Sequence, residues 1–398
     1  MAENFLHGIK LSEEAKGVRV FSKIDSSVIG IVGTAAKGEN NRPYVFLSYK
    51  EAQAVLGGPT GESTESDKDP TETLMRSIYA IFEQGAGKVV AVKVDPGASN
   101  VAGGLDEATQ KYTGIKLLEN VQKEPIGQDQ NGNPTFLDEI PRILIAPVYS
   151  SDLTVANALI KAAENLRAIA VVDCPNGTRE EAKSFAGGIS SSYAYLCYPF
   201  VKFPQGIGVV GLSSVIAGVI ARTDLEDGFW VSPSNKKINS MASLTKSVGW
   251  TLSDPTSEAN DLNQNGITTV IRQDGFRVWG NLTKAGQDDS RFKWVSVRRI
   301  ASAINETVVR NHFWAIDQNI NRNFIGTVVE SINSYMRDLE SQGAILGGKA
   351  YADPADNRIT DIKAAQITFS FEFTPVYPAN EIRFKSILSD AYIKELFT

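Results

Sequence analysis

The chain has 398 residues, 42% of them hydrophobic and 22% charged, which is enough apolar material for a real core in one to three domains. Its net charge of −6 argues against nucleic acid as the main partner, and no apolar run approaches the roughly 20 residues that membrane insertion of a helix needs. With two cysteines and two histidines, the chain is a poor candidate for a disulfide framework, a metal site or an ordinary hydrolase.

Residues 1–24 are predicted to form an N-terminal arm, because they are polar and mixed and offer little core material. Their strand-like segment contains Val18 and Val20. The start of the chain lacks the basic and apolar regions of a secretory signal, so we expect the protein to be made and folded in a cytosol.

Residues 25–265 are predicted to form an α/β domain that ends in a connecting region. Strand-like and helix-like segments alternate there, which indicates right-handed crossovers and a mostly parallel sheet. The expected strands are 28–32, 44–48, 88–94, 142–146, 168–173 and 193–198. The expected helices are 49–56, 71–84, 105–121, 153–166, 179–185 and 209–222. Cys174 and Cys197 are expected to be small buried side chains in a reducing compartment.

Residues 266–281 predict a β-hairpin, because two alternating segments flank the turn former Asp274-Gly275. A two-residue turn would place three pairs opposite one another: Val270 and Trp279, Ile271 and Val278, and Arg272 and Arg277. Two like charges across a ladder destabilise it by roughly 0.2–1 kcal/mol, so an acidic partner is expected for the two arginines. Another register would separate them. The hairpin is therefore predicted to be a docking element.

The hairpin is expected to open an α+β domain over residues 266–375. Two long amphipathic helices, 292–315 and 321–342, follow it, and Gly343 ends the second. Residues 365–373 alternate isoleucine or phenylalanine with polar residues, which predicts a half-buried strand.

Residues 376–398 are predicted to form a C-terminal arm. Pro375 and Pro378 separate it from the preceding strand, and its alternating character includes Ile382 and Phe384. Such an arm can return to its own sheet or pair with the sheet of another copy.

No catalytic, cofactor-binding or metal site is predicted. Residues 30–38 contain glycines, a threonine and a lysine, but not in the order of a phosphate-binding loop. Residues 261–266 match the first half of a calcium loop, yet Arg272 stands where a bidentate carboxylate is required. Residues 243–246 have the Ser-x-x-Lys spacing without its partner motifs. We therefore expect a protein that is not an enzyme.

Basic residues are concentrated in the first long helix and just before it. Between residues 291 and 312, five basic residues accompany Glu306 alone, which gives +4 in a chain of −6. They are Arg291, Lys293, Arg298, Arg299 and Arg310. They form either a solvated helix face or a basic surface that docks on an acidic protein. Nucleic acid is the weaker option, because no stacking aromatics are interleaved with them.

Five segments, in order along nearly the whole chain, resemble the tail sheath proteins of contractile-tailed phages and phage-tail-like bacteriocins. They are 5–9 (FLHGI), 17–20 (GVRV), 227–233 (DGFWVSP), the hairpin at 267–281 and 373–378 (FTPVYP). The hairpin is the specific part, and the similarity is greatest to the compact sheaths of smaller temperate phages. It implies a structural protein without a cofactor.

The resemblance implies a subunit that polymerises as hexameric rings around an inner tail tube. The sheath would contract irreversibly and drive the tube through a cell envelope. The implied partners are further copies of the chain, the tube protein, and baseplate and tail terminator proteins. The implied location is a virion tail or bacteriocin particle that is assembled in the cytoplasm of a host bacterium.

The resemblance also implies roles for the parts of the chain. Residues 25–265 would be an outer domain, 266–375 an inner domain that faces the tube, and the two arms would add strands to neighbouring subunits. The arm residues expected to pair are Val18, Val20, Ile382 and Phe384. The hairpin residues expected to accept a strand are Ile271, Arg272, Arg277, Val278 and Trp279. The basic residues from Arg291 to Arg310 are expected to face the tube, an inference that rests on their charge.

Two other functions stay open on the sequence. One is a monomeric binding module, and the other is an enzyme on the α/β domain, because parallel sheets often bind ligands at their carboxyl edge. An enzyme needs a phosphate loop or a nucleophile with its base, and the motifs above supply neither. A monomeric module would elute as one sharp peak at all concentrations, whereas a sheath subunit would polymerise.

Overall fold

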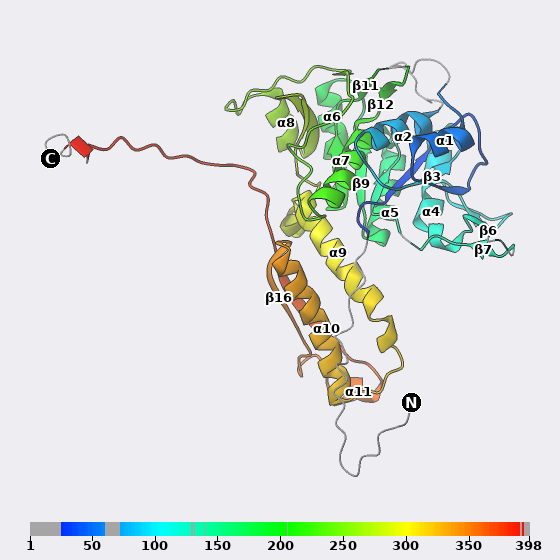
Figure 1. The fold of residues 1–398 in the computed structure, drawn as a ribbon, viewed down its shortest axis with the longest axis vertical. Coiled ribbons are helices and arrows are strands. Elements are labelled where there is room, and N and C mark those ends of the chain that lie inside the picture. Colours follow the sequence, from blue (N-terminus) through cyan, green and yellow to red (C-terminus); the bar gives the residue numbers. More distant parts are fainter. Residues whose placement is uncertain are drawn as a thin grey trace, which may run out of the picture.

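The computed structural model describes residues 25–59, 72–128, 130, 132–138, 140–204, 206–390 and 392–393. They form a layered α/β body from which a slender unit of two long helices and a β-hairpin projects (Figure 1). The expected N-terminal arm, with Val18 and Val20, lies outside the described residues.

An eight-stranded sheet forms the centre of the body, in the order β15-β14-β10-β9-β8-β1-β3-β2. Its strands are β1 (Ile29–Gly33), β2 (Pro43–Phe46), β3 (Val89–Lys93), β8 (Ile143–Ile145), β9 (Ile169–Asp173), β10 (Ala194–Cys197), β14 (Ile267–Arg272) and β15 (Phe276–Trp279). The strands from β14 to β3 are parallel, and the edge strands β2 and β15 are antiparallel to their neighbours. The prediction of a mostly parallel sheet is confirmed.

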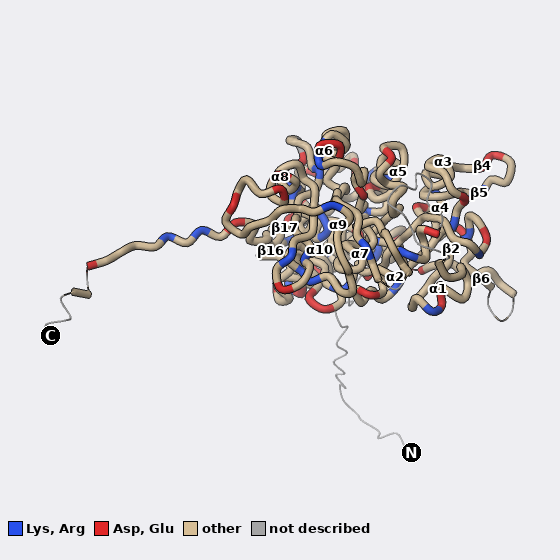
Figure 2. Tube along the Cα trace, turned by 90° about the horizontal axis from the view of Figure 1, so that it is seen from above, with Lys and Arg blue, Asp and Glu red and all other residues tan. Residues whose placement is uncertain are grey.

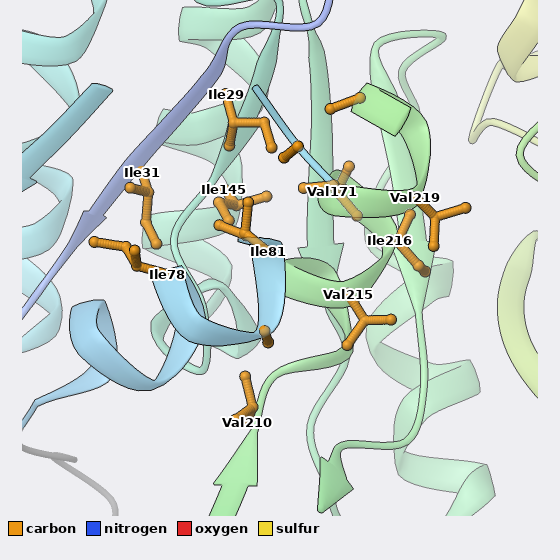
Figure 3. Packing of buried hydrophobic residues seen from close by; sticks show 14 of the residues in the cluster. Ile29, Ile31, Ile78, Ile81, Ile145, Val171, Val210, Val215, Ile216 and Val219 are labelled. Carbon is orange, nitrogen blue, oxygen red and sulfur yellow. The ribbon is translucent and has the colours of Figure 1, made fainter. Parts of the chain in front are cut away.

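Helices cover both faces of this sheet because its strands are apolar on both sides. The covering helices are α2 (Thr73–Glu83), α7 (Leu212–Glu226), α4 (Gly114–Glu119), α5 (Leu153–Leu166) and α6 (Arg179–Gly187). Ile29 and Ile31 of β1 face the core that α2 and α7 close, and Figure 3 shows this packing. Val28 and Val32 face the opposite core, which α4, α5 and α6 close. Alternate strand residues therefore supply two separate cores.

Shorter elements connect these layers. They are α1 (Tyr49–Leu56), α3 (Ala98–Ala102), α8 (Glu258–Gln264), β4 (Leu105–Asp106), β5 (Lys111–Tyr112), β6 (Gly127–Gln128), β7 (Pro134–Thr135), β11 (Val201–Phe203), β12 (Gly208–Val210), β13 (Ser243–Leu244), and the 3-10 turns η1 (Val121–Lys123), η2 (Tyr149–Ser151), η3 (Gln287–Phe292) and η4 (Phe313–Ala315). The expected helix 105–121 is wrong in its first half, because β4 and β5 pair there and the helix begins at Gly114.

A buried carboxylate fixes α7 to the end of β9. Asp173 accepts hydrogen bonds from the Ser213 amide (2.8 Å), the Ser213 hydroxyl (2.6 Å) and the Val148 amide (3.0 Å). The side chain of this aspartate thus occupies the amino-terminal end of a distant helix, where backbone N–H groups favour an acceptor. Burial raises the pKa of Asp173, and it also raises the thiol pKa values of the buried Cys174 and Cys197.

The predicted hairpin exists, but its register and its domain were predicted wrongly. The loop has three residues, with φ of 50° at Asp274 and 98° at Gly275, so Arg272 lies opposite Phe276 and Val270 opposite Val278. The two arginines are therefore not paired. Because β14 also pairs in parallel with β10, the hairpin completes the sheet of the body instead of opening the domain of the two long helices.

The projecting unit contains α9 (Val295–Asn311), α10 (Arg322–Ser341), β16 (Ile345–Tyr351), α11 (Ile359–Lys363) and β17 (Ser370–Pro375). Its own core joins apolar side chains of α9 and α10, including Ile304, Ile332 and Met336, to the inner face of β17. Phe371 and Phe373 are half-buried and alternate with exposed residues, as the sequence period predicted. In the part of the chain that the structure describes, no helix is long and apolar enough to cross a membrane.

Candidate assembly interfaces

The chain beyond β17 leaves the molecule as an extended segment. Figures 1 and 2 show the C-terminal segment after β17 running away from the body and the projecting unit. Their apolar side chains face solvent: Ile382, Ile387 and Leu388 are exposed, and Phe384 is 93% exposed. Several exposed large apolar side chains within one short segment are typical of an interaction surface. The predicted C-terminal arm thus has the exposure that pairing with another molecule requires.

The β-hairpin of the projecting unit has two strands only. β16 and β17 pair from Ile345 opposite Pro375 to Tyr351 opposite Ser370, with an irregularity at Gly347. α10 and the unit's core cover one face of this hairpin. Within the described ranges neither outer edge pairs with a further strand. The Asn333 side chain of α10 bonds the amide (2.7 Å) and the carbonyl (3.4 Å) of Ala350 in β16, which leaves the other outward main-chain groups for a strand from outside.

The root of the C-terminal arm lies in a groove of ≈ 650 Å³ between the body and the projecting unit. Three of the segments that carry the sequence resemblance meet here, represented by Trp230, by Trp279 of β15 and by Tyr377. They are far apart in the chain. The groove therefore brings together a set of residues that the sequence offered only as separate motifs.

The hairpin β14–β15 does not have the open edge that a strand acceptor needs. Residues 235–238 cover the outer side of β15: the Asn235 amide donates to Val278 O (2.6 Å) and the Ile238 amide to Phe276 O (2.8 Å). In the other direction, the Val278 amide donates to Lys236 O at 3.1 Å. The prediction that this edge accepts a strand is therefore wrong for the described conformation.

The five hairpin residues predicted to accept a strand make their contacts inside the subunit. Ile271 and Val278 are buried, and Trp279 packs edge-on against Trp250 with ring centroids 5.4 Å apart. Arg272 lies 5.9 Å from the Phe276 ring, and Arg277 donates to the carbonyls of Gln273 and Asn235, both at 2.8 Å. Neither arginine needs the acidic partner that the wrong register suggested.

Two of the five residues of the predicted basic surface are internal. Arg298 and Arg299 are each only 6% exposed. The Arg298 guanidinium lies between the rings of Phe292 (4.1 Å) and Tyr193 (4.6 Å). Of the five basic residues, Arg291, Lys293 and Arg310 are exposed, and Arg310 is also paired. A charge count along a helix could not reveal this, because Tyr193 and Asp224, which contact Arg298 and Arg299, lie in distant parts of the chain.

Arg299 joins α9 to the body by a buried, bidentate ion pair. Its Nη1 lies 2.7 Å from Oδ1 of Asp224 on α7, and its Nη2 contacts Oδ2 of the same carboxylate. The guanidinium also donates to the carbonyls of Ser26 (3.3 Å) and Phe229 (3.4 Å). Planar bidentate geometry of this kind gives both strength and orientation.

Glu306 makes the second joint between α9 and the body. Its carboxylate forms ion pairs with the guanidiniums of Arg142, Arg167 and, on the same helix, Arg310, each with an N···O distance of 2.8 Å. Burial favours a raised pKa for Glu306, but the three guanidiniums outweigh it and hold the pKa below its usual range. α9 is thus clamped to the body at two points along its length.

Replacing Glu306 with glutamine is expected to lower the free energy of unfolding by about 2–3 kcal/mol at pH 7, because the buried Arg142 loses its charged acceptor. A carboxylate with a depressed pKa stabilises the fold above its unfolded pKa, and this stabilisation is lost as the pH falls through the folded pKa. The wild-type and E306Q stabilities should therefore converge on acidification from about pH 5 to pH 3. Urea unfolding as a function of pH measures this. The exposed Glu330→Gln is the control, and a constant gap between wild type and E306Q would contradict the assignment.

Among the described residues, no group of three or more histidine, cysteine, aspartate or glutamate side chains could hold a metal ion. His312 links the two long helices: its Nδ1 lies 2.7 Å from Val308 O and its Nε2 2.8 Å from the Ser331 hydroxyl. The histidine that the structure describes therefore has a packing environment.

Comparison with known proteins agrees with these features. The phage tail sheath protein central domain matches residues 127–284, and the phage tail sheath C-terminal domain matches residues 287–388. A prophage major tail sheath protein of Pseudomonas aeruginosa (strain UCBPP-PA14) is 32% identical, with 99% of each chain covered. The tail sheath protein of Escherichia phage P2 is 27% identical over 99% of this chain and 98% of its own.

Solved structures show the same fold. A chain of the anti-feeding prophage baseplate superimposes with a TM-score of 0.70 at 19% identity, over 97% of this chain and 99% of its own. A chain of the extracellular contractile injection system PVC, in a sheath complex in the contracted state, gives a TM-score of 0.70 at 18% identity, over 98% and 99%. The first matched family domain ends after the hairpin β14–β15, and the sheet topology likewise places this hairpin in the body. The chain therefore belongs to the phage tail sheath protein family and is a structural sheath subunit.

Proposed function

We propose that this subunit polymerises with copies of itself as hexameric rings around an inner tail tube, and that the sheath contracts to drive the tube through a cell envelope. The observation that carries the proposal is an exposed apolar arm in a chain that also has a two-stranded sheet with available edges. Further partners are baseplate and tail terminator proteins. The particle is a virion tail or a bacteriocin, assembled in the host bacterial cytoplasm, and the subunit has no catalytic role.

The arms join subunits by strand addition at β16–β17. An extended chain that adds to a sheet edge gains main-chain hydrogen bonds that depend little on side-chain fit. Because a two-stranded sheet is marginal by itself, added strands also stabilise the acceptor. The acceptor is thus the hairpin of the projecting unit, which replaces the hairpin β14–β15 that the sequence suggested. The N-terminal arm, 1–24, and the C-terminal arm, 376–398, are the proposed donors.

The projecting unit is the inner, tube-facing part, and it begins after the hairpin instead of at residue 266. Two observations support this assignment: the unit has a separate core, and it projects from the body (Figure 1). With Arg298 and Arg299 buried, Arg291, Lys293 and Arg310 are the basic residues of the predicted set that can meet a tube directly. Exposed charges of this kind make weak, salt-screened contacts that can break during contraction.

A disulfide between subunits tests the strand addition. Leu346 in β16 is exposed, so Leu346→Cys combined with Ile382→Cys or Phe384→Cys should give a ladder of covalent oligomers after mild oxidation of assembled protein. The native Cys174 and Cys197 do not compete, because burial raises their thiol pKa values.

The matched control places the acceptor cysteine at Leu252, another exposed leucine, which lies on the body. Non-reducing electrophoresis is expected to show the ladder for position 346 and monomer for position 252. Equal ladders from both positions, or none from position 346 in assembled tubes, would count against strand addition at β16–β17.

A further inference from the structure

A small cavity lies between α9 and the start of β8 and β9, at the joint between the projecting unit and the body. It has a volume of ≈ 20 Å³, and its polar lining comes from Ser26, Arg142, Arg167, Arg299 and Ser302. This volume is sufficient for one water-sized particle and too small for phosphate, sulfate or a nucleotide. Any occupant is therefore monatomic or a single water.

The charges around this cavity do not balance. Arg142, Arg167 and Arg310 share the single carboxylate of Glu306, while Arg299 is matched by Asp224. Four guanidiniums thus share two paired carboxylates, and with the nearby Asp25 counted as well the excess is one positive charge. Solvent reaches Arg167 and Arg310 in part, but Arg142 is 6% exposed, and burial lowers its pKa. An uncompensated buried cation is costly, and an anion beside it reduces that cost.

Two buried donors at the cavity have unused hydrogen-bonding capacity. The Arg142 Nε–H and the Ser302 hydroxyl have no hydrogen-bond partner within the described part of the chain. Ser302 is 6% exposed, like Arg142, and both side chains line the cavity. Buried polar groups without a partner usually mark an unassigned water or ion. Three of the five polar lining residues are arginines, and the Ser26 carbonyl already accepts from Arg299, so the lining favours an anion over a metal cation.

We propose that this cavity binds one chloride ion per subunit, held by Arg142 Nε–H, the Ser302 hydroxyl and the field of Arg167 and Arg299. The ion offsets the excess positive charge of the Glu306 cluster at the point where α9 meets the sheet. It is thereby a structural ion of the joint. The site needs no other copy of the chain, so its test is independent of assembly.

Equilibrium dialysis of the full chain with radioactive chloride tests the proposal, with sodium gluconate holding the ionic strength constant. We expect one saturable chloride per chain and a thermal midpoint that rises with chloride concentration. Ser302→Ala is expected to weaken chloride binding about tenfold, because a hydrogen bond to a charged group is lost. Arg167→Gln should weaken chloride binding to a similar extent. Because the Arg167 side chain is partly exposed, this variant is expected to fold.

Ser296→Ala is the matched control. Ser296 is a buried serine of the same helix that does not line this cavity, so this variant should bind chloride like the wild type. Absence of saturable binding would overturn the proposal and assign the cavity to water. Saturable binding that neither Ser302→Ala nor Arg167→Gln weakens would overturn it too, because the ion would then lie elsewhere.

Discussion

Removal of residues 379–398 is expected to give a folded subunit that forms no rings or tubes. The truncation begins after Pro378 because Val376 packs against the core of the projecting unit, whereas residues 379–390 are exposed. Loss of exposed residues costs little folding stability. Loss of the donated strand removes the main-chain bonds between subunits. Circular dichroism should match the full chain, and negative-stain microscopy should show no polymer.

A variant of equal length separates the role of the arm's sequence from that of its mere presence. In it, Gly-Ser repeats replace residues 379–398, and we expect the same loss of assembly, because flexible Gly-Ser chains have a low tendency to form strands. Tubes formed by the truncated chain at normal yield would show that the C-terminal arm is dispensable and would remove the main support for strand exchange.

Replacing Arg299 with methionine is expected to lower the free energy of unfolding by about 3–5 kcal/mol, because Asp224 would remain buried as an unpaired charge. The pair is almost fully buried and bidentate, so water cannot replace the lost guanidinium. Urea unfolding monitored by tryptophan fluorescence measures the effect. Arg291→Met is the matched control, since Arg291 is exposed, and it should change stability by less than about 0.5 kcal/mol.

The double variant Asp224→Leu, Arg299→Met distinguishes loss of the pair from loss of packing. Removing both charges leaves no buried ion behind, so this variant should recover much of the stability lost in Arg299→Met. Equal destabilisation in the single and double variants would mean that Arg299 acts through packing alone, and that the joint does not depend on the ion pair.

The sheet was predictable from the sequence because its determinants are local. Apolar segments such as 88–94 and 168–173, spaced by amphipathic helices, indicate buried parallel strands whatever the order of the strands. The strand order itself depends on which faces pack together, and no local pattern shows that β14 joins β10. The hairpin was therefore found, but it was placed in the wrong domain.

The assembly surfaces were only partly predictable, for two physical reasons. The strand β16 was not predicted, because Gly347 and Gly348 interrupt its alternation of apolar and polar residues. Glycine is favoured at position 348 because a Cβ there would lie 3.0 Å from the Glu372 carbonyl oxygen of the paired strand. Arg298 and Arg299 were predicted as candidates for a basic surface because Tyr193 and Asp224, which help to bury them, are brought there only by tertiary structure. Whether the loop at Asp274-Gly275 has two or three residues is likewise decided by the neighbouring backbone, so the register could not be predicted.

A cryo-EM reconstruction of assembled tubes tests the central claim most directly, because it shows how many strands the sheet of β16 and β17 contains in the polymer. The account predicts that residues 381–390 of another subunit run as an added strand along one edge of this sheet, with Ile382 and Phe384 buried. Tubes in which β16 and β17 remain a two-stranded sheet and the C-terminal arm stays exposed would contradict it.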